Sequence, residues 1–371
     1  MDFDFTEDQA SLRDAVRRWV DKDYDFERRR AIVRSGGFSR EAWEGLVGLG
    51  LTGLAVAEDQ GGLGFGAVEA MVVMEELGRG IVMEPYAQAG LIAPSVLRHA
   101  PAAVQAQWLP KIAGGEALIV LAQQERGARY RVDRPQAQVD AQQRLSGHKS
   151  LVSAGDQADA FIVPARGADG GVALYLVERG AAGVKTRPYS LQDGSRAADL
   201  TLTEAPATLL VGPGEGLAVL ELALDVGIAA LCAEAVGAMD RLVLLTADYL
   251  NTRKQFGVAI ASFQALRHRM ADVKMQLELA RSMSYFATLK LGEPAEARRR
   301  ALSQAKLQLG QSMRFVGQQC IQLHGGIGVT DEYVASHYFK RLTAMEMQFG
   351  DSLHHLAEVS ARMQDQAGVF A

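Results

Sequence analysis

A segment near residue 253 carries side chains that suit a diphosphate. It runs from Arg253 to Gly257 with the sequence Arg-Lys-Gln-Phe-Gly, and Phe263 and Gln264 follow it. A guanidinium makes bidentate contacts to phosphate oxygens, and a glycine beside an aromatic residue, here Phe256, lets the backbone approach a ligand closely. The alternative is that Arg253 only caps the end of a helix.

A second segment, from Gln322 to Gly328, suits the same ligand. Its sequence is Gln-Leu-His-Gly-Gly-Ile-Gly. Because glycine has no side chain to interfere, backbone N–H groups at Gly325 and Gly326 can face an anion, and the amide of Gln322 adds a donor. The alternative for the glycines is a simple turn. The presence of both segments favours the phosphate-binding interpretation.

The histidines of the last third do not have the spacing of a metal site. They are His324, His337, His354 and His355. No pair of them matches the HExxH or Cys/His patterns of metal ligands, so we expect surface histidines and no bound metal.

Composition excludes several classes of function. The 371 residues include 39 Lys and Arg against 44 Asp and Glu, which gives a net charge of −5 and no basic field for nucleic acid. With 48% hydrophobic and 22% charged residues the composition is that of a soluble globular protein. No window approaches the roughly 20 uncharged apolar residues of a membrane span.

Cys232 and Cys320 cannot build a disulfide framework, so we expect two buried thiols and a cytoplasmic protein. The arginine runs at 28–30 and 298–300 are expected to be solvated faces or subunit contacts.

The period of the apolar residues changes along the chain. Residues 1–117 have helical spacing, and the glycine-rich stretch 61–66 is expected to be a turn because no strand precedes it. From 118 to 212 the period shortens, and short apolar runs separated by turn signals predict a small β-barrel. The predicted strands include 118–122, 145–152, 161–163, 172–177 and 199–202.

Helical spacing returns over residues 213–371. Four apolar stripes follow one another and predict a four-helix bundle. They run from Leu217 to Ala235, from Phe263 to Leu277, from Leu302 to Cys320, and through Leu342, Met345, Phe349, Leu353 and Leu356. The predicted fold is therefore mostly α with a β-barrel middle domain. Its predicted domains are 1–117 (N-terminal helical domain), 118–212 (middle β-barrel domain) and 213–371 (C-terminal four-helix bundle).

The two phosphate-binding segments, in this order and at this spacing, resemble those of the acyl-CoA dehydrogenase flavoprotein family. Shorter runs extend the resemblance along the whole chain. They are Glu75-Glu76-Leu77-Gly78, Gly114-Gly115-Glu116 and Gly147-His148-Lys149. The resemblance implies the same helical domain, barrel and helical bundle that the apolar periods predict independently.

The resemblance also implies that the cofactor is FAD. In the family the two segments reach into the flavin site of the neighbouring subunit and hold the adenosine and pyrophosphate end, so an oligomer is implied. The matching residues here are Arg253, Phe256, Gln264, Gln322, Gly325 and Gly326. Ser153 lies where the family has a hydroxyl that bonds to flavin N5, and an exposed strand serine is an equal alternative.

The family reaction removes an α-proton from a fatty acyl-CoA thioester while a β-hydride passes to flavin N5, so it needs a carboxylate base. The family's usual glutamate falls here on Phe349, and a second position used by some members falls on Gly227. Neither residue can accept a proton. Asp351 and Glu346, expected on the last helix, are weak candidates for a displaced base, and solvated or capping charges are the alternative. The backbone N–H of Phe349 can still polarise a thioester carbonyl, as that position does in the family.

A second departure from the family lies at residues 124–131. The family usually has Thr-Glu-Pro followed by Gly-Ser-Asp, whereas the sequence here is Gln-Glu-Arg-Gly-Ala-Arg-Tyr-Arg. Glu125 remains, but arginines and a tyrosine replace the small hydroxyl residues that line flavin. The arginines of this loop can bind the phosphates of CoA or can be solvated. They are Arg126, Arg129, Arg131 and Arg134.

Three functions remain open. The first is an FAD-dependent dehydrogenase, a homodimer or tetramer, which desaturates an acyl-CoA between C2 and C3 with a displaced acid and passes electrons to an electron-transfer flavoprotein. The second is a non-catalytic subunit that completes the FAD site of a separately encoded catalytic paralogue, for example in a heterotetramer. The third is a flavin-free scaffold of the same fold.

Overall fold

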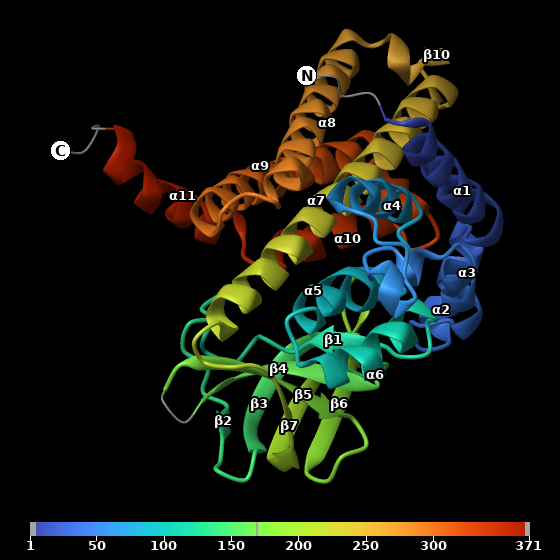
Figure 1. Cartoon of the computed structure of the whole chain (residues 1–371). Helices are drawn as coiled ribbons and strands as arrows, with labels where there is room; N and C mark the ends of the chain where they lie inside the picture. Colours follow the sequence, from blue (N-terminus) through green and yellow to red (C-terminus); the bar gives the residue numbers. More distant parts are fainter. Residues whose placement is uncertain (1–4, 168–169, 368–371) are drawn as a thin grey trace. The chain divides into compact units, whose positions relative to one another are not determined.

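The computed structural model describes residues 5–167 and 170–367 and is mostly helical (Figure 1). The chain forms two compact units. The helical unit comprises Met1–Phe26, Met71–Val82 and Ile228–Ala371, and the sheet unit comprises Glu27–Ala70 and Met83–Gly227. Secondary structure changes from helix to strand and back close to residues 117 and 212, but the compact units are divided differently, so the three-domain boundaries stay a prediction.

Eight strands form one sheet in the sheet unit. They are β1 (Ile119–Leu121), β2 (Gln138–Val139), β3 (Arg144–Ser153), β4 (Ala160–Arg166), β5 (Val172–Glu178), β6 (Val184–Ser190), β7 (Arg196–Pro206) and β8 (Thr208–Val211). The pairing order is β6-β7-β3-β2-β4-β5-β8, and β1 joins β4 in parallel. Within the described residues this ladder is an open path from β6 to β8. The five predicted strands are confirmed, and their apolar side chains, such as Leu145, Phe161 and Val177, form a buried core.

Short helices complete the sheet unit. They are α2 (Phe26–Arg34), α3 (Arg40–Gly48), the 3-10 turns η1 (Leu51–Gly53) and η2 (Glu58–Gln60), the π-helix η3 (Ala87–Ile92), α5 (Ala93–Leu97) and α6 (Ala102–Ala113). The expectation of a solvated arginine run at 28–30 is wrong for Arg29, which is 2% exposed. Its guanidinium lies on the buried side of α2 and donates to the carbonyl of Asp193 at 2.7 Å, so the buried group has a hydrogen-bond partner. The glycine run at 114–116 also has a structural role, because the Trp43 indole donates to the Gly115 carbonyl at 3.0 Å.

The helical unit is built from long helices that pack along one core. They are α1 (Glu7–Asp23), most of α4 (Ala67–Arg79), most of α7 (Gly216–Thr252), α8 (Gln264–Lys290), α9 (Ala295–His324), the short η5 (Gly325–Val329), α10 (Val334–Met347) and α11 (Ser352–Ala367). The predicted inward stripes of α7, α8 and α9 are confirmed in part, since Leu231, Leu277 and Leu309 are buried in one cluster. Phe263, which was predicted to begin the second stripe, precedes α8 and is exposed. The predicted buried thiols are confirmed too, for both Cys232 and Cys320.

Close backbone contact joins α4 to α7. A Cβ at Gly78 would lie 2.0 Å from the carbonyl oxygen of Glu234, and a Cβ at Gly237 would lie 1.8 Å from that of Glu75. Only glycine allows two helix backbones to approach this closely. The glycine of the Glu-Glu-Leu-Gly run is thus explained by helix packing. Its second carboxylate, Glu76, is buried against the Arg17 guanidinium.

Helix α7 qualifies the expectation that no segment is apolar enough to cross a membrane, although acidic residues such as Asp225 and Glu234 interrupt its apolar sequence. Within the described residues it has the length and hydropathy of a span, with a mean hydropathy of 2.0 over its most apolar window. However, 67% of that window is buried inside the protein, as in a core helix. Its apolar residues, among them Val236 and Met239, pack in the core of the helical unit.

The predicted fourth helix of the bundle is wrong. It is two helices, α10 and α11, separated by a turn at residues 348–351. The turn arises because Phe349 and Gly350 both have positive φ angles, 56° and 112°, which no α-helix can contain. Leu353 and Leu356 consequently lie on exposed parts of α11, at 76% and 48% exposure, instead of in the core.

The expectation of surface histidines is also wrong. His324, His337 and His355 are at most 7% exposed. Each has a ring nitrogen within hydrogen-bond distance of a backbone carbonyl, so the buried rings have polar partners. No group of three or more His, Cys, Asp or Glu residues that could hold a metal ion occurs in the described part of the chain.

Candidate cofactor-binding site

The first phosphate-binding segment forms a hairpin that follows α7. Two short strands, β9 (Lys254–Gln255) and β10 (Val258–Ala259), pair antiparallel. The two residues between them, Phe256 and Gly257, have φ angles of 54° and 81°, as a tight two-residue hairpin turn requires. This turn places the Phe256 ring at the tip, where it is 91% exposed.

The predicted side chains of this hairpin face solvent. Arg253 and Gln264, which begins α8, are exposed, and Arg253 forms no ion pair in the described residues. A helix-capping role for Arg253 finds no support, since its side chain donates to no backbone carbonyl in the part of the chain that the structure describes. The Phe256 ring at the tip makes an edge-on contact with the Phe263 ring, with the two ring centroids 6.1 Å apart. An exposed guanidinium, an amide and an aromatic ring are thus presented together beyond the end of α7.

The second segment ends α9. Gly325 terminates this helix with φ 64° and ψ −141°, a conformation that favours glycine, and its N–H bonds to the Gln322 carbonyl. The N–H of Gly325 is therefore used inside the protein, which corrects the expectation that it faces an anion. Gln322 and Gly326 are exposed, so an amide side chain and a glycine without a covering side chain remain accessible.

Three aromatic rings bring the two segments together. The His324 ring lies 4.7 Å from that of Tyr249 on α7 and 5.1 Å from that of Tyr333, which precedes α10. Tyr249 is one turn before Arg253, and its carbonyl accepts a bond from the Arg253 N–H at 2.8 Å. The predicted cofactor residues of the helical unit thus gather where α7 and α9 both end. Their guanidinium, amides and exposed glycine backbone fit the donor set that an adenosine diphosphate group needs.

The turn at 348–351 contains Phe349, the residue on which the base position of the family was expected to fall. Phe349 lies there, packed in part against the core, and not on a helix as the sequence predicted. The backbone of the turn is held by buried donors. Lys306, which has no exposed surface, donates from Nζ to the carbonyls of Glu346 at 2.8 Å and Gly350 at 2.9 Å. His355 Nε2 lies 3.0 Å from the carbonyl of Phe349.

Both candidate displaced bases have structural partners. Glu346 Oε1 accepts bonds from the backbone N–H of Ser352 at 3.0 Å and from its hydroxyl at 2.7 Å. Asp351 Oδ1 accepts from the N–H of His354 at 2.8 Å, so this carboxylate caps the start of α11. The capping alternative describes these two acids better than the base alternative does. Gly227 lies within α7 and brings no side chain.

Burial sets the protonation of the groups beneath this turn. Loss of solvation lowers the pKa of Lys306 to about 8, and nearby acidic groups only partly oppose it. Loss of solvation, together with the Lys306 charge, lowers the pKa of His355 to about 3, so its ring is neutral near pH 7. Neither residue was singled out from the sequence. A lysine beside Ala305 in an otherwise apolar helix stripe was the available signal for Lys306.

The loop at 124–131 lies in the sheet unit and lines a cavity of about 440 Å³. Arg126 and Arg187 both lie 3.7 Å from Asp199, and both are largely exposed. Arg129 also lines the cavity and makes no ion pair within the described residues. Arg131 and Arg134 pair loosely with Asp133 on the surface, which favours the solvated alternative for these two.

Glu125 anchors that loop instead of facing a ligand. It is 5% exposed and forms an ion pair of 2.7 Å with the fully buried Lys149. Burial alone would raise the pKa of Glu125, but the Lys149 charge and the backbone N–H groups of Gln136 and Ala137 outweigh it and lower the pKa. Burial lowers the pKa of Lys149 in turn.

Ser153 ends β3, where its backbone pairs with Ala197. It is half-buried, and its hydroxyl has no hydrogen-bond partner among the described residues. The neighbouring Leu151 has a φ of 52° at an irregularity in the β3–β7 pairing and exposes its side chain. These features are compatible with either alternative for Ser153, whose role stays a prediction.

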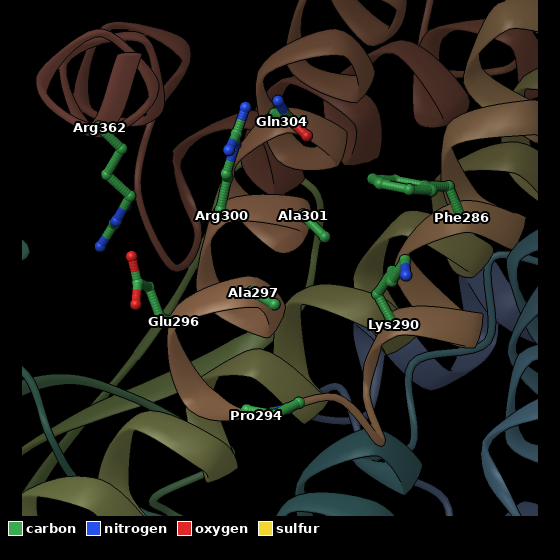
Figure 2. Close-up of a pocket in the computed structure, with 9 residues that line it drawn as sticks. All are labelled: Phe286, Lys290, Pro294, Glu296, Ala297, Arg300, Ala301, Gln304 and Arg362. Atoms are coloured by element: carbon green, nitrogen blue, oxygen red, sulfur yellow. The ribbon is translucent and has the colours of Figure 1, made fainter. Parts of the chain in front are cut away.

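A larger cavity, of about 590 Å³, contains none of the predicted site residues. It lies between the end of α8, the start of α9 and α11, and Figure 2 shows Arg362 and Glu296 on one side of it and Phe286 and Lys290 on the other. Its cations have partners nearby, because Lys290 pairs with Glu293 at 3.0 Å and Arg362 with Glu358 at 3.0 Å. We assign no ligand to it.

Comparison with known proteins identifies the family. Residues 6–116 match the N-terminal domain of acyl-CoA dehydrogenase, and residues 214–364 match its C-terminal domain. The acyl-CoA dehydrogenase IpdE2 of Mycobacterium tuberculosis is 30% identical over 90% of this chain and 91% of its own length. A variant of the Tcur3481-Tcur3483 steroid ACAD is similar in structure, with a TM-score of 0.89, 29% identity and coverage of 98% and 99% of the two chains. The ChsE4-ChsE5 complex of Mycobacterium tuberculosis gives a TM-score of 0.89, 26% identity and coverage of 99% and 100%. Members of this family are oxidoreductases that act on CH–CH groups, and the chain belongs to the acyl-CoA dehydrogenase family.

Proposed function

We propose that this chain is the non-catalytic subunit of a heteromeric acyl-CoA dehydrogenase, and that it completes the FAD site of a catalytic paralogue. One observation carries the proposal: the turn that corresponds to the base position presents Phe349, and the two nearest acids are committed to the start of α11. A proton-abstracting carboxylate must be free to approach the substrate. A homo-oligomeric dehydrogenase that uses Asp351 or Glu346 would first have to break these bonds.

The exposed residues beyond α7 and α9 support the second half of the proposal. Arg253, Phe256 and Gln322 face solvent in the single chain, as groups that serve a neighbouring subunit must. In the complex, Arg253 would bind the diphosphate of FAD, and Gln264 and Gln322 would donate amide hydrogen bonds to the same end. The FAD of the partner supplies the acceptor for the substrate hydride. Two of the similar structures carry paired names, which is in line with a heteromeric assembly.

The proposal extends to the wider setting. The complex would desaturate an acyl-CoA and pass its electrons to an electron-transfer flavoprotein. Because one similar structure is named a steroid ACAD, steroid-derived thioesters belong in the substrate panel together with short and branched ones. The two unpaired, buried cysteines suit a reducing compartment, and we propose the cytoplasm.

A comparison of the chain alone with its complex tests the proposal. The purified chain should retain little FAD, and no acyl-CoA of the panel should bleach its oxidised flavin band under anaerobic conditions. Co-expression with a catalytic paralogue from the same genome should yield a yellow complex that acyl-CoA bleaches. Robust turnover by the pure homo-oligomer would overturn the proposal.

Two arginine variants sharpen this test. Arg253→Ala in the complex should lower the FAD content at least tenfold, because a charge-assisted bidentate contact is lost. Arg269→Ala is the matched control, since Arg269 is also an exposed arginine and lies on α8 outside the predicted site. Equal FAD content in the two variant complexes would remove the support for an FAD-completing role.

A further inference from the structure

The contacts around His324 connect the two segments that the proposed function assigns to FAD. His324 is the last residue of α9 and is 2% exposed, so its ring lies inside the protein although its neighbours Gly325 and Gly326 are exposed. The Tyr249 ring from α7 and the Tyr333 ring from the residue before α10 both lie against it, at 4.7 and 5.1 Å. Three element ends therefore meet at one imidazole.

The hydrogen bonds of His324 define its tautomer. Nδ1 lies 2.8 Å from the carbonyl of Cys320, which can only accept, so Nδ1 carries the proton. Nε2 is then the acceptor for the Tyr333 hydroxyl, at 3.3 Å. Burial lowers the pKa of His324, which keeps this neutral form in place near pH 7. The ring is thereby fixed at both nitrogens.

Each cofactor segment is attached to this ring by its backbone. On one side, the Arg253 N–H donates to the Tyr249 carbonyl at 2.8 Å, and the Arg253 carbonyl accepts from Ile260 at 2.9 Å, so the base of the hairpin is tied to the α7 turn that holds Tyr249. On the other side, η5 folds back over His324. A Cβ at Gly328 would lie 2.9 Å from the His324 Cβ, so only glycine fits there.

We infer that His324 is a positioning residue that sets the distance between the Arg253 hairpin and the Gln322–Gly326 segment, so that both can bind one diphosphate-bearing cofactor. The inference rests on the proposed function, since it assigns the shared ligand to these two segments. His324 itself does not touch the ligand, because its ring is covered. The ring acts through its contact with Tyr249 on the first segment. On the second segment it acts through the bond of Nδ1 to the Cys320 carbonyl, which fixes the last turn of α9.

Binding of ADP to the full-length chain tests the inference without a partner subunit. ADP represents the end of FAD that these segments are proposed to hold, and its affinity can be measured by NMR titration. His324→Ala should weaken ADP binding at least tenfold. Tyr333→Phe, which removes only the hydroxyl, should weaken it about threefold, and His324→Gln, which keeps a polar group near the Nε2 position, should recover part of the loss seen with alanine.

Hydrogen exchange separates positioning from a general loss of stability. His324→Ala should raise exchange at residues 253–260 and 325–329 together, while amides in the middle of α8 and α9 keep their protection. Faster exchange confined to 325–329 would overturn the inference, as would unchanged ADP affinity in both His324→Ala and Tyr333→Phe.

The Arg253→Ala variant distinguishes the two possible failures. If Arg253→Ala weakens ADP binding and the His324 and Tyr333 variants do not, only the positioning role is refuted. If Arg253→Ala itself leaves ADP binding unchanged, the proposed FAD-completing function fails and the inference fails with it. Loss of ADP binding in Arg253→Ala and in His324→Ala, with Arg269→Ala unaffected, supports both.

Discussion

Replacement of Lys306 by methionine tests how the turn at Phe349 is held. The Lys306 ammonium is fully buried and donates to two backbone carbonyls, those of Glu346 and Gly350. Lys306→Met removes the donor of both hydrogen bonds and also removes a charge from the interior. These two changes have opposite effects on the free energy of unfolding. Loss of a partner by a buried carbonyl costs about 1–3 kcal/mol, whereas removal of a buried charge is favourable.

The pH dependence of the free energy of unfolding separates the effect of the buried Lys306 charge from the effect of the lost hydrogen bonds. The pKa of Lys306 is about 8 in the folded protein against 10.5 for an ordinary lysine. Between these values the unfolded chain binds more protons than the folded one, so the free energy of unfolding must rise with pH. A difference of 2.5 pKa units corresponds to about 3 kcal/mol. The destabilisation by the buried charge is therefore fully present below pH 8 and is lost by about pH 10.5.

Urea unfolding of the wild type and of Lys306→Met at pH 7, 8, 9 and 10 measures this effect. The stability of the wild type relative to the variant should increase by about 2–3 kcal/mol over this range. In the wild type neither neighbouring group titrates in the folded protein between pH 7 and 10. Burial raises the pKa of Cys232 to about 12, and burial together with the Lys306 charge lowers that of His355 to about 3. A stability difference that stays constant from pH 7 to 10 would refute the reasoning.

Three further substitutions have defined outcomes. Gly237→Ala should destabilise the fold by about 2 kcal/mol or more in urea unfolding, because its Cβ would meet the Glu75 carbonyl at 1.8 Å, and a change below 0.5 kcal/mol would contradict the close α4–α7 contact. Lys149→Met should cost about 3 kcal/mol near pH 7, since it leaves the Glu125 carboxylate buried with backbone donors only, and the loss should shrink when Glu125→Gln is added. Phe349→Glu puts a carboxylate at the base position, yet the purified chain should still not be bleached by acyl-CoA, because the loop at 124–131 stays altered. Bleaching by that variant would show that the base was the only missing group.

The regular parts of the fold could be predicted because they depend on local periods. The 3.6-residue period identified α7, α8 and α9, and short apolar runs between turn signals identified strands such as β4 and β5. Strand β6 has mostly exposed residues and a proline, so no apolar period marked it. The break after α10 was missed for a related reason: apolar residues continue at helical spacing through Phe349, while the chain direction is set by two positive φ angles.

The candidate site was predictable only at residues that are recognisable from their own type and their spacing from close neighbours in the sequence. Arg253 and Gln322 stood out by type and spacing, and they are exposed near the ends of two helices that meet. The groups that hold the site could not be found in this way, because their partners are distant in the sequence. Lys306 acts on carbonyls 40 and 44 residues away, and the histidines expected on the surface are buried by helices that the sequence does not place.

The contacts of the turn explain how this fold can accommodate a residue other than glutamate at position 349. Among the described residues, the hydrogen bonds that hold the turn do not involve the side chain of residue 349, which packs in part against the core. Lys306 donates to the carbonyls of Glu346 and Gly350, His355 lies against that of Phe349, and the Ser352 hydroxyl donates to Glu346. A change of glutamate to phenylalanine at this position alters one side chain and leaves the supporting bonds intact. A structural likeness of TM-score 0.89 to a relative is therefore expected whether or not a base is present. Under the proposed function, the residue type at position 349, together with the hydrogen bonds of Glu346 and Asp351, decides which role this chain performs.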